Sequence, residues 1–82
     1  MDPKATLDAL LGALAARDWD RSEELADGLL RWLKQRGFPP LTVGPENLGR
    51  QWHRDVATFI CFAAKSKVRD ARNRRARKIR GN

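Results

Sequence analysis

Apolar residues recur at helical spacing near the start of the chain. Leucines stand at every third or fourth position between residues 3 and 16, the spacing of one face of an α-helix: Leu7, Leu10, Leu11 and Leu14. Asp2 can cap the first turn, and Pro3 suits the first helical position because its missing N–H would have no partner there. We therefore predict a helix over residues 3–16.

A second amphipathic pattern begins after Asp18, which is a suitable N-cap. Acidic residues follow in the first turns, where the helix dipole favours negative charge. The apolar residues of this stretch cover an arc of roughly 160° on a helix: Leu25, Ala26, Leu29, Leu30, Trp32 and Leu33. We predict that Gly37 ends the helix as the left-handed C′ residue, with Pro39 and Pro40 preventing its continuation.

A third helical pattern starts at Pro45. Its apolar residues again fall on one side, and we expect them to face the core: Leu48, Trp52, Val56, Phe59, Ile60, Phe62 and Ala63. A buried strand over residues 56–64 is the alternative, but no second strand is present to pair with it. Only Gly49 interrupts the pattern before Arg80. The sequence thus predicts an all-α fold, a helical hairpin with a long third helix.

The charge divides the chain into two parts. Residues 1–64 hold eight Lys/Arg and nine Asp/Glu, whereas residues 65–82 hold nine Lys/Arg and the single acid Asp70. We therefore expect a helical body over residues 1–64 and a basic tail or helix extension over residues 65–82. Such an asymmetry indicates an interaction with an acidic partner.

Arginine outnumbers lysine in the basic segment "KSKVRDARNRRARKIRGN" by six to three. Arginine favours forked contacts with phosphate, whereas lysine would serve solubility equally well. On a helix these cations would point in nearly every direction, and only Val68 and Ile79 are apolar, which disfavours a membrane-surface helix or a groove-binding helix. The candidate nucleic-acid-binding residues are Lys65, Lys67, Arg69, Arg72, Asn73, Arg74, Arg75, Arg77, Lys78 and Arg80. A solvated end without a partner and a contact with an acidic protein surface remain alternatives.

Other chemistry is sparse. The lone Cys61 excludes an intramolecular disulfide and cannot form a zinc cluster by itself, which fits a reducing, cytoplasmic environment. It lies opposite the predicted apolar stripe, so it would either fill a second interface or be an exposed thiol. His53 has no second His or Cys nearby, and its neighbours Arg54 and Asp55 indicate a surface position. We expect no enzyme activity, no catalytic residue, no metal and no cofactor.

The three tryptophans could stack on nucleic-acid bases. Trp32 and Trp52 fall within the predicted apolar stripes, which favours core packing. Trp19 stands near a helix start and is the most exposed candidate, although a hydrophobic-staple role is the preferred interpretation.

No membrane segment is expected. The stretch "LLGALAA" lacks a basic region before it, and Asp8 interrupts its apolar run, so we interpret it as part of a helix. The chain also contains no run of eighteen apolar residues.

Two stretches resemble known families. The segment over residues 16–30 is similar to the turn and second helix of a tetratricopeptide repeat in Ala16, Asp18, Trp19, Asp20, Ser22 and Ala26. The pattern does not recur, so this resemblance implies a tight helical hairpin and no peptide groove. The stretch "RDARNRRARKIR" is similar to arginine-rich RNA-binding motifs, which implies that arginines contact phosphates and base edges. From "DWD" to "GFPP" the chain also resembles small uncharacterised bacterial helical proteins.

The length of 82 residues permits one domain with a small core. The apolar faces of the second and third helices are wider than a three-helix body needs, so we expect a homodimer or a protein partner. The favoured function is non-enzymatic, electrostatic binding of nucleic acid, with RNA slightly ahead of DNA. The alternative is a protein-interaction module or an assembly subunit.

Overall fold

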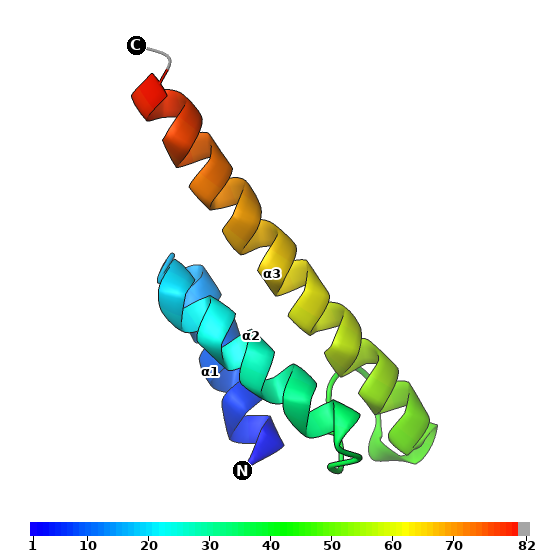
Figure 1. The fold of residues 1–82 in the computed structure, drawn as a ribbon. Coiled ribbons are helices and arrows are strands. Elements are labelled where there is room, and N and C mark those ends of the chain that lie inside the picture. The colour runs from blue at the N-terminus through cyan, green and yellow to red at the C-terminus, as the bar shows by residue number, and fades with distance from the viewer. Residues whose placement is uncertain (81–82) are drawn as a thin grey trace.

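The protein is an elongated three-helix fold. In the computed structural model, the described residues are 1–80 for the backbone and 1–75 for the side chains. Helix α1 spans Pro3–Ala15, α2 spans Trp19–Lys34, a 3₁₀ turn spans Glu46–Leu48, and α3 spans Arg50–Arg80 (Figure 1). No strand occurs within residues 1–80, so the prediction of an all-α fold with a long third helix is confirmed.

The arrangement places α2 between its two neighbours. Helix α2 packs against both α1 and α3, and the chain direction alternates along the three helices (Figure 1). The molecule measures 52 × 21 × 20 Å, because the C-terminal part of α3 projects past the α1–α2 hairpin. The basic segment begins alongside the hairpin, where Lys65 and Arg72 contact α2, and continues into the projecting part.

Local capping explains the hairpin. The Asp2 carboxylate accepts hydrogen bonds from the backbone N–H groups of Lys4 and Ala5 at 3.1 and 3.2 Å, as predicted. The Asp18 carboxylate caps α2 in the same way. Between the helices Arg17 adopts a left-handed conformation with φ of 58°. The N–H of Asp18 then bonds the carbonyl of Ala13 at 2.9 Å, which closes a Schellman turn.

The end of α2 corrects the prediction for Gly37. The left-handed C′ residue is Arg36, with φ of 62°, and Gly37 is the residue after it. The N–H of Gly37 bonds the carbonyl of Trp32 at 2.9 Å, again in a Schellman turn. Glycine is needed at position 37 for space, because a Cβ there would overlap the indole of Trp32. That indole donates a 2.8 Å hydrogen bond to the carbonyl of Phe38.

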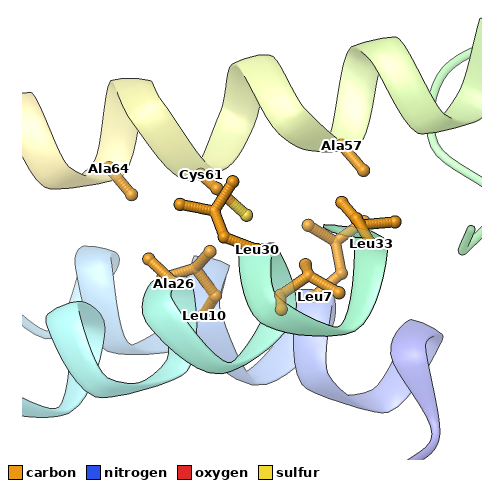
Figure 2. Close-up of a cluster of buried hydrophobic side chains, with 9 residues drawn as sticks. Leu7, Leu10, Ala26, Leu30, Leu33, Ala57, Cys61 and Ala64 are labelled. Carbon is orange, nitrogen blue, oxygen red and sulfur yellow. The ribbon is translucent and has the colours of Figure 1, made fainter. Parts of the chain in front are cut away.

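The core joins leucines of the hairpin to small residues of α3 (Figure 2). Leu7 and Leu10 come from α1, and Leu29 and Leu33 belong to α2, so the predicted stripes of these helices do face the core. The full cluster is Leu7, Leu10, Ala26, Leu29, Leu30, Leu33, Ala57, Cys61 and Ala64. Leu11 departs from its predicted stripe and is 47% exposed.

Helix α3 packs by a different face from the predicted one. Its buried residues recur every three or four positions: Ala57, Cys61, Ala64 and Val68. The aromatic residues that we expected in the core point to solvent, with Phe59 72% and Phe62 54% exposed. The physical reason is that small side chains let α3 approach α2 closely, which large aromatic rings would prevent. The buried face also extends past Ala63, since Val68 is buried inside the basic segment.

Cys61 lies on this buried face, so it is not an exposed thiol. Its side chain is fully buried and fills the interface with the hairpin, on the side of α3 opposite the predicted stripe. Burial, together with the nearby carboxylate of Asp27, raises the pKa of the thiol to about 11.

His53 is also buried, which corrects its expected surface position. Its Nδ1 accepts a 3.0 Å hydrogen bond from the backbone N–H of Thr42, so the ring proton resides on Nε2. Nε2 then donates to the carbonyl of Pro45 at 3.0 Å. One helical residue therefore fixes both arms of the loop between α2 and α3. No pattern in the sequence signals this role, because it arises from hydrogen bonds to a loop.

Arg54 and Trp52 complete the anchoring of this loop. The guanidinium of Arg54 donates to the carbonyls of Leu33 and Gly37 at 2.6 and 3.1 Å and so ties α3 to the turn that ends α2. Trp52 is 45% exposed, contrary to the expected core position, and its indole donates to the carbonyl of Val43 at 2.8 Å.

Candidate nucleic-acid interface

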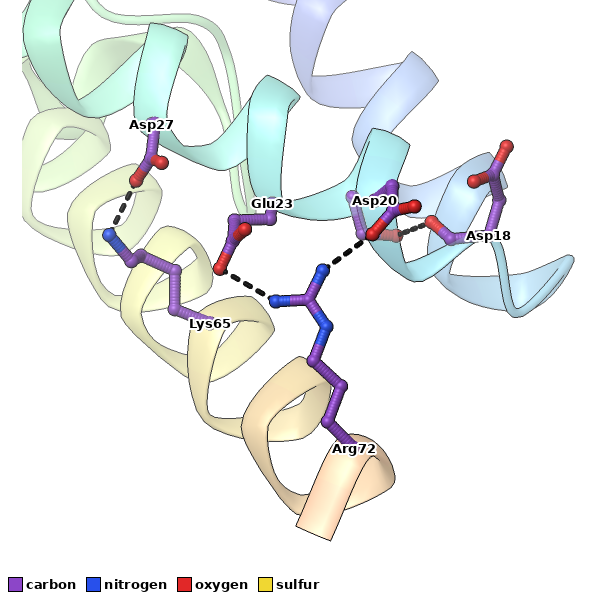
Figure 3. Close-up of polar contacts among 7 residues, drawn as sticks. Asp18, Asp20, Glu23, Asp27, Lys65 and Arg72 are labelled. Atoms are coloured by element: carbon purple, nitrogen blue, oxygen red, sulfur yellow. Dashed lines mark hydrogen bonds and ion pairs between the residues drawn. The ribbon is translucent and has the colours of Figure 1, made fainter. Parts of the chain in front are cut away.

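The structure separates the cations of the basic segment by their surroundings. Two of them, Lys65 and Arg72, form ion pairs with α2 (Figure 3). Lys65 pairs with Asp27, and the two Nη atoms of Arg72 bind Asp20 at 2.6 Å and Glu23 at 3.1 Å. These hydrogen bonds raise the pKa of both basic groups, so both stay cationic with their charge compensated.

Matching spacing on the two helices explains these pairs. Asp20 and Asp27 are seven residues apart on α2, and Lys65 and Arg72 are seven residues apart on α3. Seven residues make about two helical turns, so each pair lies on one face of its helix. The pairs are partly exposed and contribute little to stability. Their main effect is to fix how α3 lies along α2.

A second group of cations surrounds a cleft between α3 and the α1–α2 turn. Lys67, Arg74 and Arg75 line the cleft from α3, and Arg17 lines it from the turn. The cleft has a volume of about 370 Å³, and Leu14, Trp19 and Ala71 complete its lining. None of these seven lining residues is an acid. A concave surface lined by four cations attracts anions. The carboxylates of Asp18 and Asp20 line an adjoining depression that shares Arg17, Trp19 and Arg75 with the cleft.

Helix geometry places these cations together. Residues 67, 71, 74 and 75 are separated by four, three and one positions, so they share one side of α3. Arg17 reaches the cleft because it occupies the left-handed position of the α1–α2 turn. The described cations of α3 therefore point in several directions, as expected from the sequence: Lys65 and Arg72 face α2, Arg69 lines a separate depression, and Lys67, Arg74 and Arg75 line the cleft.

Trp19 is the first residue of α2 and is half-buried, so part of its indole remains accessible at the cleft. The expected staple role does not apply, because the residue before the N-cap Asp18 is Arg17 and not Trp19. An indole beside several cations is a suitable surface for stacking an unpaired base.

The remaining predicted residues lie elsewhere. Arg69 and Asn73 line a separate depression with Phe62 and Ser66, and the Arg69 Nη2 is 3.5 Å from the Ser66 hydroxyl. Arg69 is exposed and forms no ion pair with the described residues. The predicted residues Arg77, Lys78 and Arg80 lie outside the described side chains.

Other site types have little support in the described part of the chain. Within it, no three His, Cys, Asp or Glu side chains come together as a metal site requires. None of the described helices is long and apolar enough to cross a membrane. No protein-family model, curated protein or solved structure matches the chain.

Sequence reasoning missed half of this cleft. Lys67, Arg74 and Arg75 were among the predicted residues, but Arg17 was not, and Trp19 was assigned a packing role. The two stretches are some 50 residues apart in the chain. Only the return of α3 along the hairpin brings them together.

Proposed function

We propose that this protein binds single-stranded nucleic acid in the cleft between α3 and the α1–α2 turn. The observation that carries the proposal is the convergence of Arg17, Lys67, Arg74 and Arg75 around one indole, with no acid in the lining. Four cations in one cleft attract a phosphate backbone electrostatically.

The proposed contacts have two parts. Lysine and arginine side chains neutralise successive phosphates, which supplies an affinity that depends little on sequence. An unpaired base then stacks on Trp19, a contact worth roughly 1–3 kcal/mol that every base can make. Lys65 and Arg72 hold α3 against the hairpin and keep the cleft formed.

We expect the protein to bind RNA slightly more tightly than DNA. The basic segment is rich in arginine, whose planar fork matches phosphate. Specific recognition of RNA also tends to use unpaired bases in loops and bulges, which suit a cleft with one stacking surface. The cations provide no means of telling ribose from deoxyribose, so the preference should be small.

The test is a binding titration with a fluorescently labelled single-stranded RNA of about 12 nucleotides, read by anisotropy. Lys67, Arg74 and Arg75 are replaced together by Ala. We expect the affinity to fall at least tenfold at constant salt. The matched control replaces Arg31 and Lys34, two exposed cations near the end of α2, and should change it less than twofold.

Trp19→Leu examines the stacking contact separately, because leucine keeps apolar bulk but removes the flat aromatic surface. We expect a loss of about fivefold or more, with the salt dependence unchanged. Equal binding by the triple cation variant and the intact chain would remove the cleft from consideration as the binding site.

A protein-interaction role is the second candidate, and a different observation favours it. The side of α3 that faces away from α2 exposes several aromatic residues. A contact through that side leaves the cleft free, so the two functions are compatible.

A further inference from the structure

Helix α3 has a second apolar face, on the side away from α2. We call this the outer face and define it by five residues: Trp52, Val56, Phe59, Phe62 and Ala63. Phe59 is 72% exposed, Phe62 54% and Trp52 45%. Large aromatic side chains gathered on one exposed helix face typically mark an interaction surface.

Neither α1 nor α2 covers this face. Both helices lie on the side of α3 that carries Ala57, Cys61 and Ala64 (Figure 2). The indole of Trp52 is tied to the loop by its hydrogen bond to the Val43 carbonyl, whereas the two phenylalanines project freely. Within the described residues, nothing covers these two side chains.

We infer that the occupant is a second copy of this chain, with its α3 antiparallel to the first. Residues 65–82 carry a net charge of +8, so a parallel pair would place two such segments side by side. In an antiparallel pair centred between Phe59 and Phe62, the two Arg72 residues are about 35 Å apart along the axis, at 1.5 Å per residue. That separation exceeds the screening length of roughly 8 Å in physiological salt, so the repulsion is small.

One register of the antiparallel pair is self-complementary. It sets Phe59 of each copy against Phe62 of the other, which allows edge-to-face aromatic contacts at the centre. The same register sets Trp52 opposite Arg69, a cation–π arrangement. Asp55, an exposed acid on this side of the helix, then lies level with Ser66 of the other copy and about one helical turn from Arg69.

The charges along the outer face support this register. Asp55 lies on the N-terminal side of the phenylalanines and Arg69 on the C-terminal side, so an antiparallel pair brings these opposite charges close together twice. The exposed Asp70 then lies level with Gln51 of the other copy. A parallel pair would set Arg69 against Arg69. The α1–α2 hairpin packs on the side of α3 that carries Ala57, Cys61 and Ala64, away from the outer face (Figure 2).

The area that the outer face would bury indicates a dimer of moderate affinity. Aromatic side chains bury 150–250 Å² each, so the exposed fractions here correspond to roughly 300 Å² per copy from the three rings. Val56, Ala63 and the flanking polar residues raise this to about 500–600 Å² per copy, near the lower limit for a specific interface. We therefore expect a dissociation constant on the order of 1–100 μM.

The experiment is sedimentation of the full chain from about 1 to 500 μM, with Phe59→Asp as the test variant. We expect a monomer–dimer transition for the intact chain and a midpoint raised at least 30-fold for the variant. Because Phe59 is largely exposed, the variant should keep its helical circular dichroism and melting temperature as a monomer. The control is Leu11→Asp on α1. Leu11 is an apolar residue with 47% exposure, similar to that of Trp52, and its replacement should leave the midpoint of the monomer–dimer transition unchanged.

Orientation is tested by disulfide formation. Ser66→Cys alone should crosslink slowly, because the two copies of residue 66 are about 16 Å apart along the axis of an antiparallel pair. A mixture of Ser66→Cys and Asp55→Cys chains should form the mixed disulfide rapidly. The native Cys61 is buried and gives little background.

Three results would overturn this inference. A monomer at 500 μM would assign the outer face to a different protein. Dissociation by Leu11→Asp but not by Phe59→Asp would place the interface on α1. Rapid crosslinking of Ser66→Cys alone would require a parallel pair. None of these results bears on the proposed nucleic-acid cleft, which shares no residue with the outer face.

Discussion

The face by which α3 packs can be tested with two opposed substitutions, Ala64→Leu and Phe59→Ala. Ala64 is 2% exposed and faces α2, whereas Phe59 is 72% exposed. Adding three carbon atoms at position 64 overpacks the interface between the helices, which typically costs 1–3 kcal/mol. Removing an exposed ring should change the free energy of unfolding by at most about 0.5 kcal/mol.

For a chain of this size, 1 kcal/mol shifts the melting temperature by about 4–8 °C. We therefore expect Ala64→Leu to lower the melting temperature by about 10 °C and Phe59→Ala to shift it by less than 4 °C. Thermal and urea unfolding should be followed by circular dichroism near 1 μM protein, so that the proposed dimer does not add to the stability. A large loss for Phe59→Ala with a neutral Ala64→Leu would mean that α3 packs by its aromatic side.

Three further substitutions test local features of the fold. Because the pKa of the Cys61 thiol is higher in the folded state, its contribution to stability is complete below the ordinary pKa of 9.0 and is lost as pH rises towards 11. The free energy of unfolding should therefore fall by about 2 kcal/mol over that range. Cys61→Ala should remove most of this decline. His53→Ala removes the hydrogen-bond partner of the partly buried Thr42 amide and of the Pro45 carbonyl and should cost about 1–3 kcal/mol in urea unfolding, whereas no loss would mean that other contacts hold the loop. Gly37→Val should lower the free energy of unfolding by about 1 kcal/mol or more, because it displaces the indole of Trp32. Arg36→Gly should raise it by about 0.5–1 kcal/mol, because glycine adopts the left-handed conformation without strain. Melting curves with the opposite order of stability would mean that residue 37, and not residue 36, has the left-handed conformation.

The helical hairpin could be predicted from the sequence because its signals are local. Asp2, Pro3 and Asp18 act within one turn of where they stand, and the leucines of α1 and α2 mostly face the core as their spacing indicates. The C-terminal end of α2 was misplaced by one residue, since a glycine that is needed for space looks the same in sequence as one needed for its left-handed conformation.

The face of α3 was misjudged because the aromatic residues dominate any estimate of hydrophobicity. The relevant signal was weaker: small or branched residues at positions 57, 61, 64 and 68, together with Lys65 and Arg72 spaced to match Asp20 and Asp27. This weaker pattern can be recognised only when the helix that packs against α3 is known. The cleft is a similar case, because Arg17 and Trp19 join the basic segment only through the tertiary fold.

The most direct test of the proposed function is the salt dependence of RNA binding. If the four cations of the cleft meet phosphates, the logarithm of the association constant should fall against the logarithm of salt concentration with a slope of about −3, at −0.7 per contact for a single strand. Replacing Lys67, Arg74 and Arg75 together by Ala should bring the slope to about −1, while replacing Arg31 and Lys34 should leave it unchanged. The same slope and affinity for the triple variant as for the intact chain would contradict the account.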